Sequence, residues 1–257
     1  MRAALTRHPR MTAAVLGVAA LAAWETASRA GVLPQIAFPP PSAAAVALAR
    51  LAWGGSLLAD LGATVVRVGE GMVLGTLPAA VVGLLMGWSP RLRAILDPFV
   101  AALHPLPKVA LLPLLMVFFG IGELSKVAAV AIGAFFPMLL SAVAGVRHIA
   151  PSLFEVAANY GATRRKVFAR IVLPGSMPLL LTGLRLSFNV ALLITIAVEL
   201  MGAERGIGTL LWLAWQTLRT DRLYAALLVI ACVGMAFNAI VALLARRLIP
   251  WQPRGEG

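Results

Sequence analysis

Long apolar stretches alternate with short polar segments along the whole chain. A helix needs about 20 apolar residues to cross a bilayer, so each stretch has the length of one crossing. We therefore predict an all-α, polytopic membrane protein with six transmembrane helices. The expected spans are Met11–Ala27, Gly69–Trp88, Pro98–Phe119, Lys126–Val146, Gly175–Leu200 and Leu223–Leu244.

The same pattern predicts three parts of unequal size. Residues 1–56 are expected to form an N-terminal anchor helix and a periplasmic interfacial segment. Residues 57–250 are expected to form the transmembrane domain, and residues 251–257 a short cytoplasmic tail. We find no repeat of fixed period and no segment with the composition of a soluble domain.

The N-terminal part begins with basic residues followed by the first apolar stretch. Two interpretations of this stretch remain open: a secretory signal peptide cleaved near Ala30, or a retained anchor, which its near-spanning length favours. Prolines 34 and 39–41 then break any helix. Ser42 is expected to cap the alanine-rich helix that follows, which ends at about Trp53.

Glycines in the second span recur at multiples of four residues, at Gly71, Gly75, Gly83 and Gly87. This spacing places small residues on one face, where another helix can approach closely. The alternative is that the glycines only reflect the glycine-rich composition of membrane helices.

The third span contains Pro105, Pro107 and Pro113, with Lys108 near its middle. Proline at membrane depth leaves carbonyls that need other partners, and a buried lysine is costly. These residues favour a segment that lines a cavity. In the alternative, the embedded part begins after Lys108, and the lysine side chain extends to the membrane interface.

The segment Pro151–Pro174 is a polar interruption that predicts two short helices. Ser152 is expected to cap the first, with Glu155 reaching back to the Ser152 amide. Gly161 should end that helix, because glycine adopts a left-handed conformation without strain. Thr163 is expected to cap the second helix, and Leu173-Pro174 to end it.

Basic residues predict the orientation in the membrane, because positively charged loops stay in the cytoplasm. A cytoplasmic N-terminus places six basic residues outside: Arg29, Arg50, Lys126, Arg205, Arg219 and Arg222. It places thirteen inside: Arg2, Arg7, Arg10, Arg91, Arg93, Arg147, Arg164, Arg165, Lys166, Arg170, Arg246, Arg247 and Arg254. Both termini and the segment Pro151–Pro174 are therefore expected in the cytoplasm.

Composition excludes several functional classes. The chain is 61% hydrophobic with a formal net charge of +12, but its basic residues are dispersed, which argues against nucleic-acid binding. There is no phosphate-binding loop, and the single cysteine, Cys232, rules out a disulfide framework. His8, His104 and His148 lack the spacing of a metal site. We expect no enzymatic activity, no catalytic residue and no metal site in this chain.

The segment Pro151–Pro174 contains Glu155-Val156-Ala157, then Gly161, then Ile171-Val172-Leu173-Pro174. With Val156 in place of the usual alanine, this pattern resembles the EAA loop, the motif with which permease subunits of bacterial ATP-binding-cassette (ABC) importers contact their ATPase. Further stretches resemble the nitrate, sulfonate and taurine permeases of that superfamily. They are Phe38–Ser42, Ser89-Pro90, Asp97-Pro98, Leu112–Leu114, Phe118–Gly122, Gly183–Arg185, Glu199 and Gly206–Gly208.

This resemblance implies the type I importer permease fold and a bacterial inner-membrane location. It implies that two copies form a pore, that a cytoplasmic ABC ATPase dimer binds below it, and that a periplasmic substrate-binding protein delivers the solute. ATP and magnesium would be held by the ATPase, so this chain would need no cofactor. The residues implied in ATPase coupling are Ser152, Glu155, Ala157, Ala158, Gly161, Leu173 and Pro174.

A small anionic solute needs positive or hydrogen-bonding groups along its path. Lys108, Arg185 and Asn189 are the candidates, and Glu199 is interpreted as a structural or gating residue near the outer mouth. The four basic residues after Thr163 are interpreted mainly as ligands for anionic lipid headgroups. An alternative function is a self-sufficient secondary transporter or channel, which would favour internal repeats and more embedded carboxylates.

Overall fold

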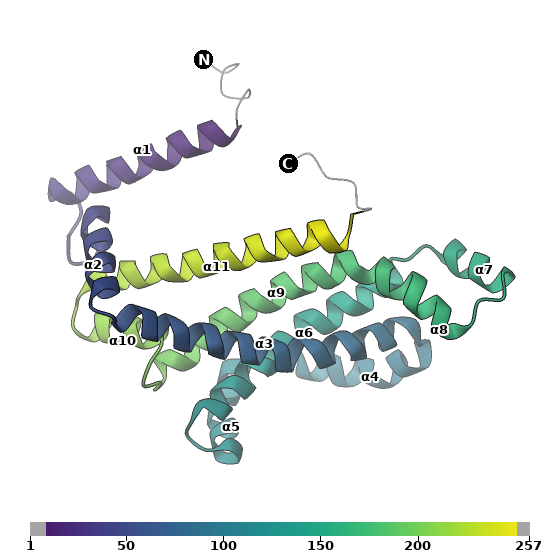
Figure 1. Cartoon of the computed structure of the whole chain (residues 1–257). Helices are drawn as coiled ribbons and strands as arrows, with labels where there is room; N and C mark the ends of the chain where they lie inside the picture. Colours follow the sequence, from purple (N-terminus) through teal and green to yellow (C-terminus); the bar gives the residue numbers. More distant parts are fainter. Residues whose placement is uncertain (1–8, 251–257) are drawn as a thin grey trace.

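The computed structural model describes residues 9–250, with side chains from Met11 onward, and all regular elements in this range are helical (Figure 1). The helices are α1 (Pro9–Arg29), α2 (Pro41–Trp53), α3 (Ser56–Trp88), α4 (Pro90–Leu103), α5 (Leu112–Phe119), α6 (Glu123–Arg147), α7 (Pro151–Asn159), α8 (Arg164–Val167), α9 (Leu173–Leu200), α10 (Ile207–Gln216) and α11 (Thr220–Leu248). The expected tail at 251–257 and residues Arg2, Arg7 and His8 lie outside the described range.

Five continuous helices in the described range are long and apolar enough to cross a membrane. They are α1, α3, α6, α11 and the continuous helix Arg164–Leu200, which contains α8 and α9. A sixth candidate is a bent pair, in which α4 and the segment Lys108–Phe119 meet at 86°. The prediction of an all-α membrane protein is confirmed, and six spans are present when the bent pair counts as one.

Two predicted boundaries are wrong. The second span does not begin at Gly69, because α3 is already helical from Ser56. The third span is not a single helix from Pro98 to Phe119, because helix α4 already begins at Pro90 and ends at Leu103. The chain bends after Leu103 because Pro105 and Pro107 each lack the N–H that would continue the helix.

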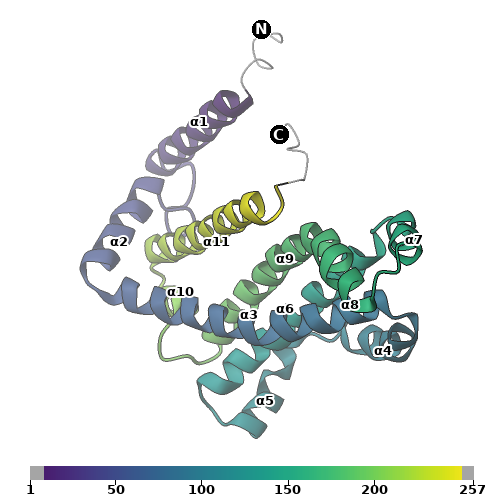
Figure 2. The same cartoon turned by 45° about the vertical axis from the view of Figure 1, so that its right-hand side comes forward.

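Helices α3, α6 and α9 form the core of the bundle and lie side by side in both views (Figures 1 and 2). Two buried apolar clusters join them. One includes Met72, Val130 and Phe188, and the other includes Met86 and Leu139. The core therefore consists of helix-to-helix contacts along most of the length of α3.

The glycine stripe of α3 faces α6 as predicted. A Cβ atom added at Gly83 would lie 2.6 Å from the carbonyl oxygen of Leu139, and one at Gly87 would lie 2.7 Å from Cβ of Val146. Added Cβ atoms at Gly71 and Gly75 would collide with Val130 and Ala131. These glycines therefore have a packing function, since only a missing side chain permits this approach.

We expect Gly83→Val to destabilise the protein by roughly 1–3 kcal/mol or more, because the new side chain forces α3 away from α6. Gly69→Val is the matched control on the same helix, where an added Cβ meets no atom within 4 Å. The measurement is the midpoint of thermal unfolding in detergent. Equal midpoints for the two variants would contradict close α3–α6 packing.

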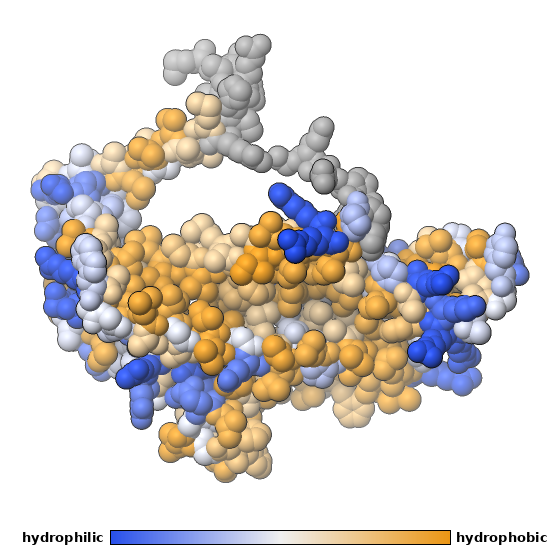
Figure 3. Space-filling view, viewed as in Figure 1, coloured by the Kyte–Doolittle hydropathy of each residue, from blue (hydrophilic) through white to orange (hydrophobic). Residues whose placement is uncertain are grey.

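Helix α1 lies apart from the bundle (Figures 1 and 2) and contacts it mainly near its end, where the Trp24 and Tyr224 ring centroids are 5.3 Å apart. The predicted cap at Ser42 is wrong, because Pro41 begins α2 and no side chain caps it. Instead, the Ser42 hydroxyl donates a 2.7 Å hydrogen bond to Glu25 of α1. Apolar side chains cover much of the bundle surface (Figure 3), as expected for contact with lipid.

Candidate coupling and translocation sites

Helices α7 and α8 form a hairpin at one end of the bundle, and α2 and α10 lie at the opposite end (Figures 1 and 2). We call residues 151–167 the hairpin and the two ends the hairpin end and the opposite end. Hydrophilic side chains gather on the hairpin beside the apolar surface of the bundle (Figure 3). The segment predicted to be a polar interruption is therefore a separate structural element.

The capping box predicted at Ser152 and Glu155 is wrong. Helix α7 begins at Pro151, its N-cap residue is Ala150, and no side-chain hydrogen bond caps it. Proline is preorganised for the first helical position, so the helix starts one residue too early for Ser152 to act as the cap. Ser152 and Glu155 are both exposed on the first turns of α7.

The predicted end of α7 and start of α8 are confirmed. Gly161 has a φ of +65°, and its N–H donates a 3.0 Å hydrogen bond to the carbonyl of Ala158. The N–H of Ala162 donates to the carbonyl of Ala157 at 2.9 Å, which satisfies another free carbonyl. Thr163 caps α8 by accepting a 3.4 Å hydrogen bond from the Lys166 N–H.

The predicted helix end at Leu173-Pro174 is wrong. A π-helical turn, Phe168–Val172, continues α8 directly into α9, which starts at Leu173. A π turn changes the hydrogen-bond pattern at this point, so Pro174 lies in the first turn of α9 without interrupting the chain. An uninterrupted helical backbone thus joins the hairpin to the long spanning helix α9.

The predicted coupling residues lie on α7, at Gly161 after it, and at Leu173 and Pro174 in the first turn of α9. Glu155, Ala158 and Tyr160 are exposed, and Tyr160 is 87% exposed although it is aromatic. Ala157 is only 8% exposed, so it packs inside this chain. The expectation that it is open to a partner is therefore wrong. Ala158 lines a cavity between α7 and the α3–α4 junction, so the exposed groups outside that cavity are the Glu155 carboxylate and the Tyr160 ring that follows α7.

The polar residues expected along a solute path lie at two places. Lys108 lies at the bend between α4 and α5, where its Nζ donates to the carbonyl of His104 and lies 4.7 Å from the Phe136 ring centroid. Arg185 and Asn189 lie one turn apart on α9 and are both exposed. Within the described residues no ion pair joins Arg185 or Lys108 to an acidic group.

Glu199 lies in a buried ion-pair network at the opposite end of the bundle. Its carboxylate pairs with Arg67 of α3, and the two residues are 1% and 3% exposed. It also accepts hydrogen bonds from the Thr64 hydroxyl at 2.9 Å and from the Gly208 N–H at 2.8 Å. Arg67 also pairs with Glu123 of α6 at 2.7 Å. The network therefore ties α3, α6, α9 and the start of α10 together.

Two glycines make room for this network. Gly206 has a φ of +145°, and a Cβ there would meet the carboxylate of Glu199. A Cβ at Gly208 would lie 2.6 Å from Cβ of Glu199. The carboxylate thus lies at the N-terminus of α10, where a negative charge is favourable. Glu199 therefore has a structural role, because its carboxylate contacts Arg67, Thr64 and the Gly208 N–H.

No pattern in the sequence predicts Arg67 as the partner of Glu199. The two residues are separated by 132 positions, so no local spacing links them. One signal was present: ionisable residues within apolar spans pair with one another or line water-filled cavities. Arg67 and Glu199 are two such ionisable residues. Which of these residues pair depends on how the spans pack against one another.

Comparisons with known proteins agree on the class of this chain. A family model described as "Binding-protein-dependent transport system inner membrane component" matches residues 71–252. A putative aliphatic sulfonates transport permease protein of Bacillus subtilis is 32% identical over 98% of this chain and 91% of its own length. The taurine transport system permease protein of Escherichia coli is 33% identical over 96% of this chain and 91% of its own length.

The fold is also similar to that of a solved transporter. A chain of the MetNI methionine ABC transporter in an inward-facing conformation matches with a TM-score of 0.65 at 16% identity, over 77% of this chain and 97% of that chain. At this identity the likeness concerns the fold alone. Together with the family match over most of the spans, these findings establish that the chain belongs to the binding-protein-dependent transport system inner membrane components, the permease family of ABC importers.

Proposed function

We propose that two copies of this chain form the pore of an ATP-driven importer for a small anionic solute such as a sulfonate, taurine or nitrate. The observation that carries the proposal is the exposed hairpin, continuous with a spanning helix, in a chain of this permease family. The names of the sulfonate and taurine relatives support the solute class.

The hairpin is the proposed attachment point for an ABC ATPase dimer. Exposed Glu155 offers a carboxylate to a partner surface, and Gly161 fixes the end of the helix that carries it. ATP and magnesium are held by the ATPase, and this chain binds neither. ATP-driven closure of the ATPase pair moves the hairpin and, through the π turn, the α9 span.

Arg185 and Asn189 are the proposed solute contacts on α9, and Lys108 contributes from the α4–α5 bend. Polar side chains exposed at membrane depth are costly against lipid, which supports a position on a water-filled path between two copies. Both termini and the hairpin face the cytoplasm in this arrangement. A periplasmic substrate-binding protein delivers the solute at the opposite end.

Uptake by reconstituted vesicles tests this function. The vesicle membrane holds this chain, with its ATPase and ATP on the inside and its binding protein on the outside. These vesicles should accumulate labelled taurine or an alkanesulfonate. An analogue of the same size that lacks the sulfonate charge should not accumulate. Equal uptake by vesicles that hold this chain alone would contradict the proposal and favour a secondary transporter or channel.

A further inference from the structure

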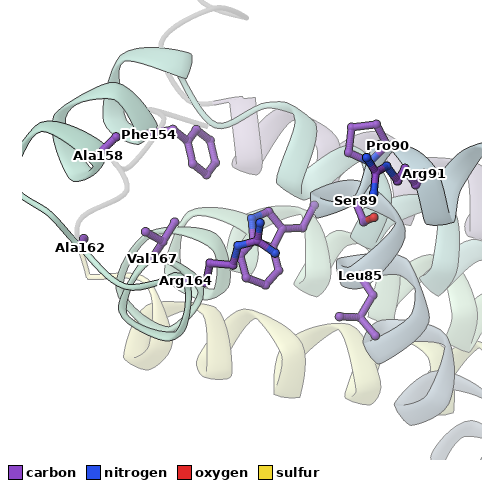
Figure 4. Close-up of a pocket in the computed structure, with 10 residues that line it drawn as sticks. Leu85, Ser89, Pro90, Arg91, Phe154, Ala158, Ala162, Arg164 and Val167 are labelled. Carbon is purple, nitrogen blue, oxygen red and sulfur yellow. The ribbon is translucent and has the colours of Figure 1, made fainter.

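A cavity of about 800 Å³ lies between the hairpin and the junction of α3 with α4 (Figure 4). One wall is formed by Phe154 of α7 and by Arg164 and Val167 of α8. The other wall includes Leu85 of α3 and Arg91 of α4. In Figure 4 the Arg164 side chain extends from α8 into the space between these walls. The cavity is open to the surroundings and large enough for a polar group of several heavy atoms.

The charge on this cavity is positive. Arg91 and Arg164 are exposed, and neither forms an ion pair within the described part of the chain. No acidic residue is among those that line the cavity. The nearby Arg93 instead faces Asp97 on its own helix, at 3.8 Å. Two guanidinium groups therefore line one cavity, and a guanidinium group can donate paired hydrogen bonds to a phosphate.

The remainder of the lining is mainly apolar and lies at the end of a membrane span. Leu85, Phe154 and Val167 are apolar, and Trp88 is the last residue of the spanning helix α3. The Trp88 ring also packs against Phe168, with centroids 5.2 Å apart. Tryptophan at the end of a span is typical of the level of lipid headgroups. The cavity therefore combines two cations with an apolar wall at the depth of a headgroup.

We propose that this cavity binds the phosphodiester headgroup of one anionic phospholipid, with Arg91 and Arg164 holding the phosphate and Leu85, Trp88 and Phe154 contacting the glycerol and upper acyl chain. The bound lipid would join the hairpin to the α3–α4 junction across the cavity. A basic pocket between spans at a headgroup surface is suited to such lipids. An acidic protein segment would use the two arginines but not the apolar wall.

Lipid retention by the purified chain tests the site, and it does not depend on the solute or on the ATPase. The chain is extracted from vesicles of phosphatidylcholine and phosphatidylglycerol, and bound phosphatidylglycerol is counted by native mass spectrometry. We expect Arg91→Gln/Arg164→Gln to bind it about 30-fold more weakly, from roughly 1 kcal/mol per arginine. Arg165→Gln/Arg170→Gln removes the same charge from exposed hairpin-end positions outside the lining and should retain the lipid.

Four results would overturn the proposal. Equal loss in the two double variants would indicate general attraction to anionic lipid, and unchanged retention in both would show that the cavity holds no such lipid. Displacement by excess inorganic phosphate would indicate a general anion site. Loss of the ATPase from the Arg91→Gln/Arg164→Gln complex with lipid retained would indicate a protein contact. The single variants Arg91→Gln and Arg164→Gln should each show a partial loss of bound phosphatidylglycerol. They replace the double variant in the test if it does not fold.

Discussion

Replacing Glu155 by arginine is expected to release the ATPase from the complex while the chain itself stays folded. Glu155 is exposed and has no ion pair within the described residues, so the substitution removes no contact inside this chain. Losing one partner of a hydrogen-bonded charge pair at an interface costs about 2–5 kcal/mol, which is roughly a 30-fold or greater loss of affinity. Co-purification of the ATPase with the tagged chain measures this loss.

The matched control is Glu204→Arg, which makes the same charge change at an exposed site before α10. This variant should retain the ATPase, because α10 lies at the opposite end of the bundle (Figure 1). If both variants keep the ATPase, or both lose it, Glu155 does not make a specific contact.

Gly161 tests the geometry of the hairpin separately from its charge. Its φ is +65° and an added Cβ meets no atom within 4 Å, so only backbone strain opposes a side chain there. Gly161→Val should therefore weaken ATPase binding, because a β-branched residue resists this conformation. Gly161→Asn should keep most of it, because asparagine tolerates the left-handed region.

Breaking the buried pair between Arg67 and Glu199 is expected to have the largest effect on stability. Arg67→Met leaves the carboxylate of Glu199 buried without its guanidinium partner, which costs about 3–5 kcal/mol. The double variant Arg67→Met/Glu199→Gln should recover part of that loss, because the charge is removed and the amide oxygen still accepts from Gly208. Thermal unfolding in detergent measures both.

Arg93→Met is the control for this experiment. Arg93 pairs with Asp97 at 3.8 Å, and both side chains are partly exposed, so its loss should cost less than about 1 kcal/mol. A stability of Arg67→Met equal to that of Arg93→Met would show that the network does not hold the spans together.

Local chemistry accounts for what the sequence predicted correctly. Gly161 and Thr163 end and start helices through hydrogen bonds within a few residues, so their roles follow from short patterns. The glycine stripe of α3 also follows from spacing, because residues at multiples of four share one helix face. The number of spans follows from the length of each apolar stretch, because about 20 apolar residues are needed to cross a bilayer.

Prolines in the first turn of a helix account for the wrong predictions of helix boundaries. Pro151 moved the start of α7 ahead of Ser152, and the π turn carried the chain past Pro174. Both prolines are accepted at first-turn positions, so neither marks a boundary by itself. The partnership of Arg67 with Glu199 depends on how distant spans pack, which no local pattern contains.

Photo-cross-linking from the hairpin in native membranes tests the central claim most directly. Benzoylphenylalanine placed at Val156, which is 51% exposed beside Glu155, should form a covalent product with the cytoplasmic ATPase. The same group at Trp53, exposed at the opposite end, should not. Capture of the ATPase from Trp53 but not from Val156, or a product between Val156 and a periplasmic protein, would contradict the account.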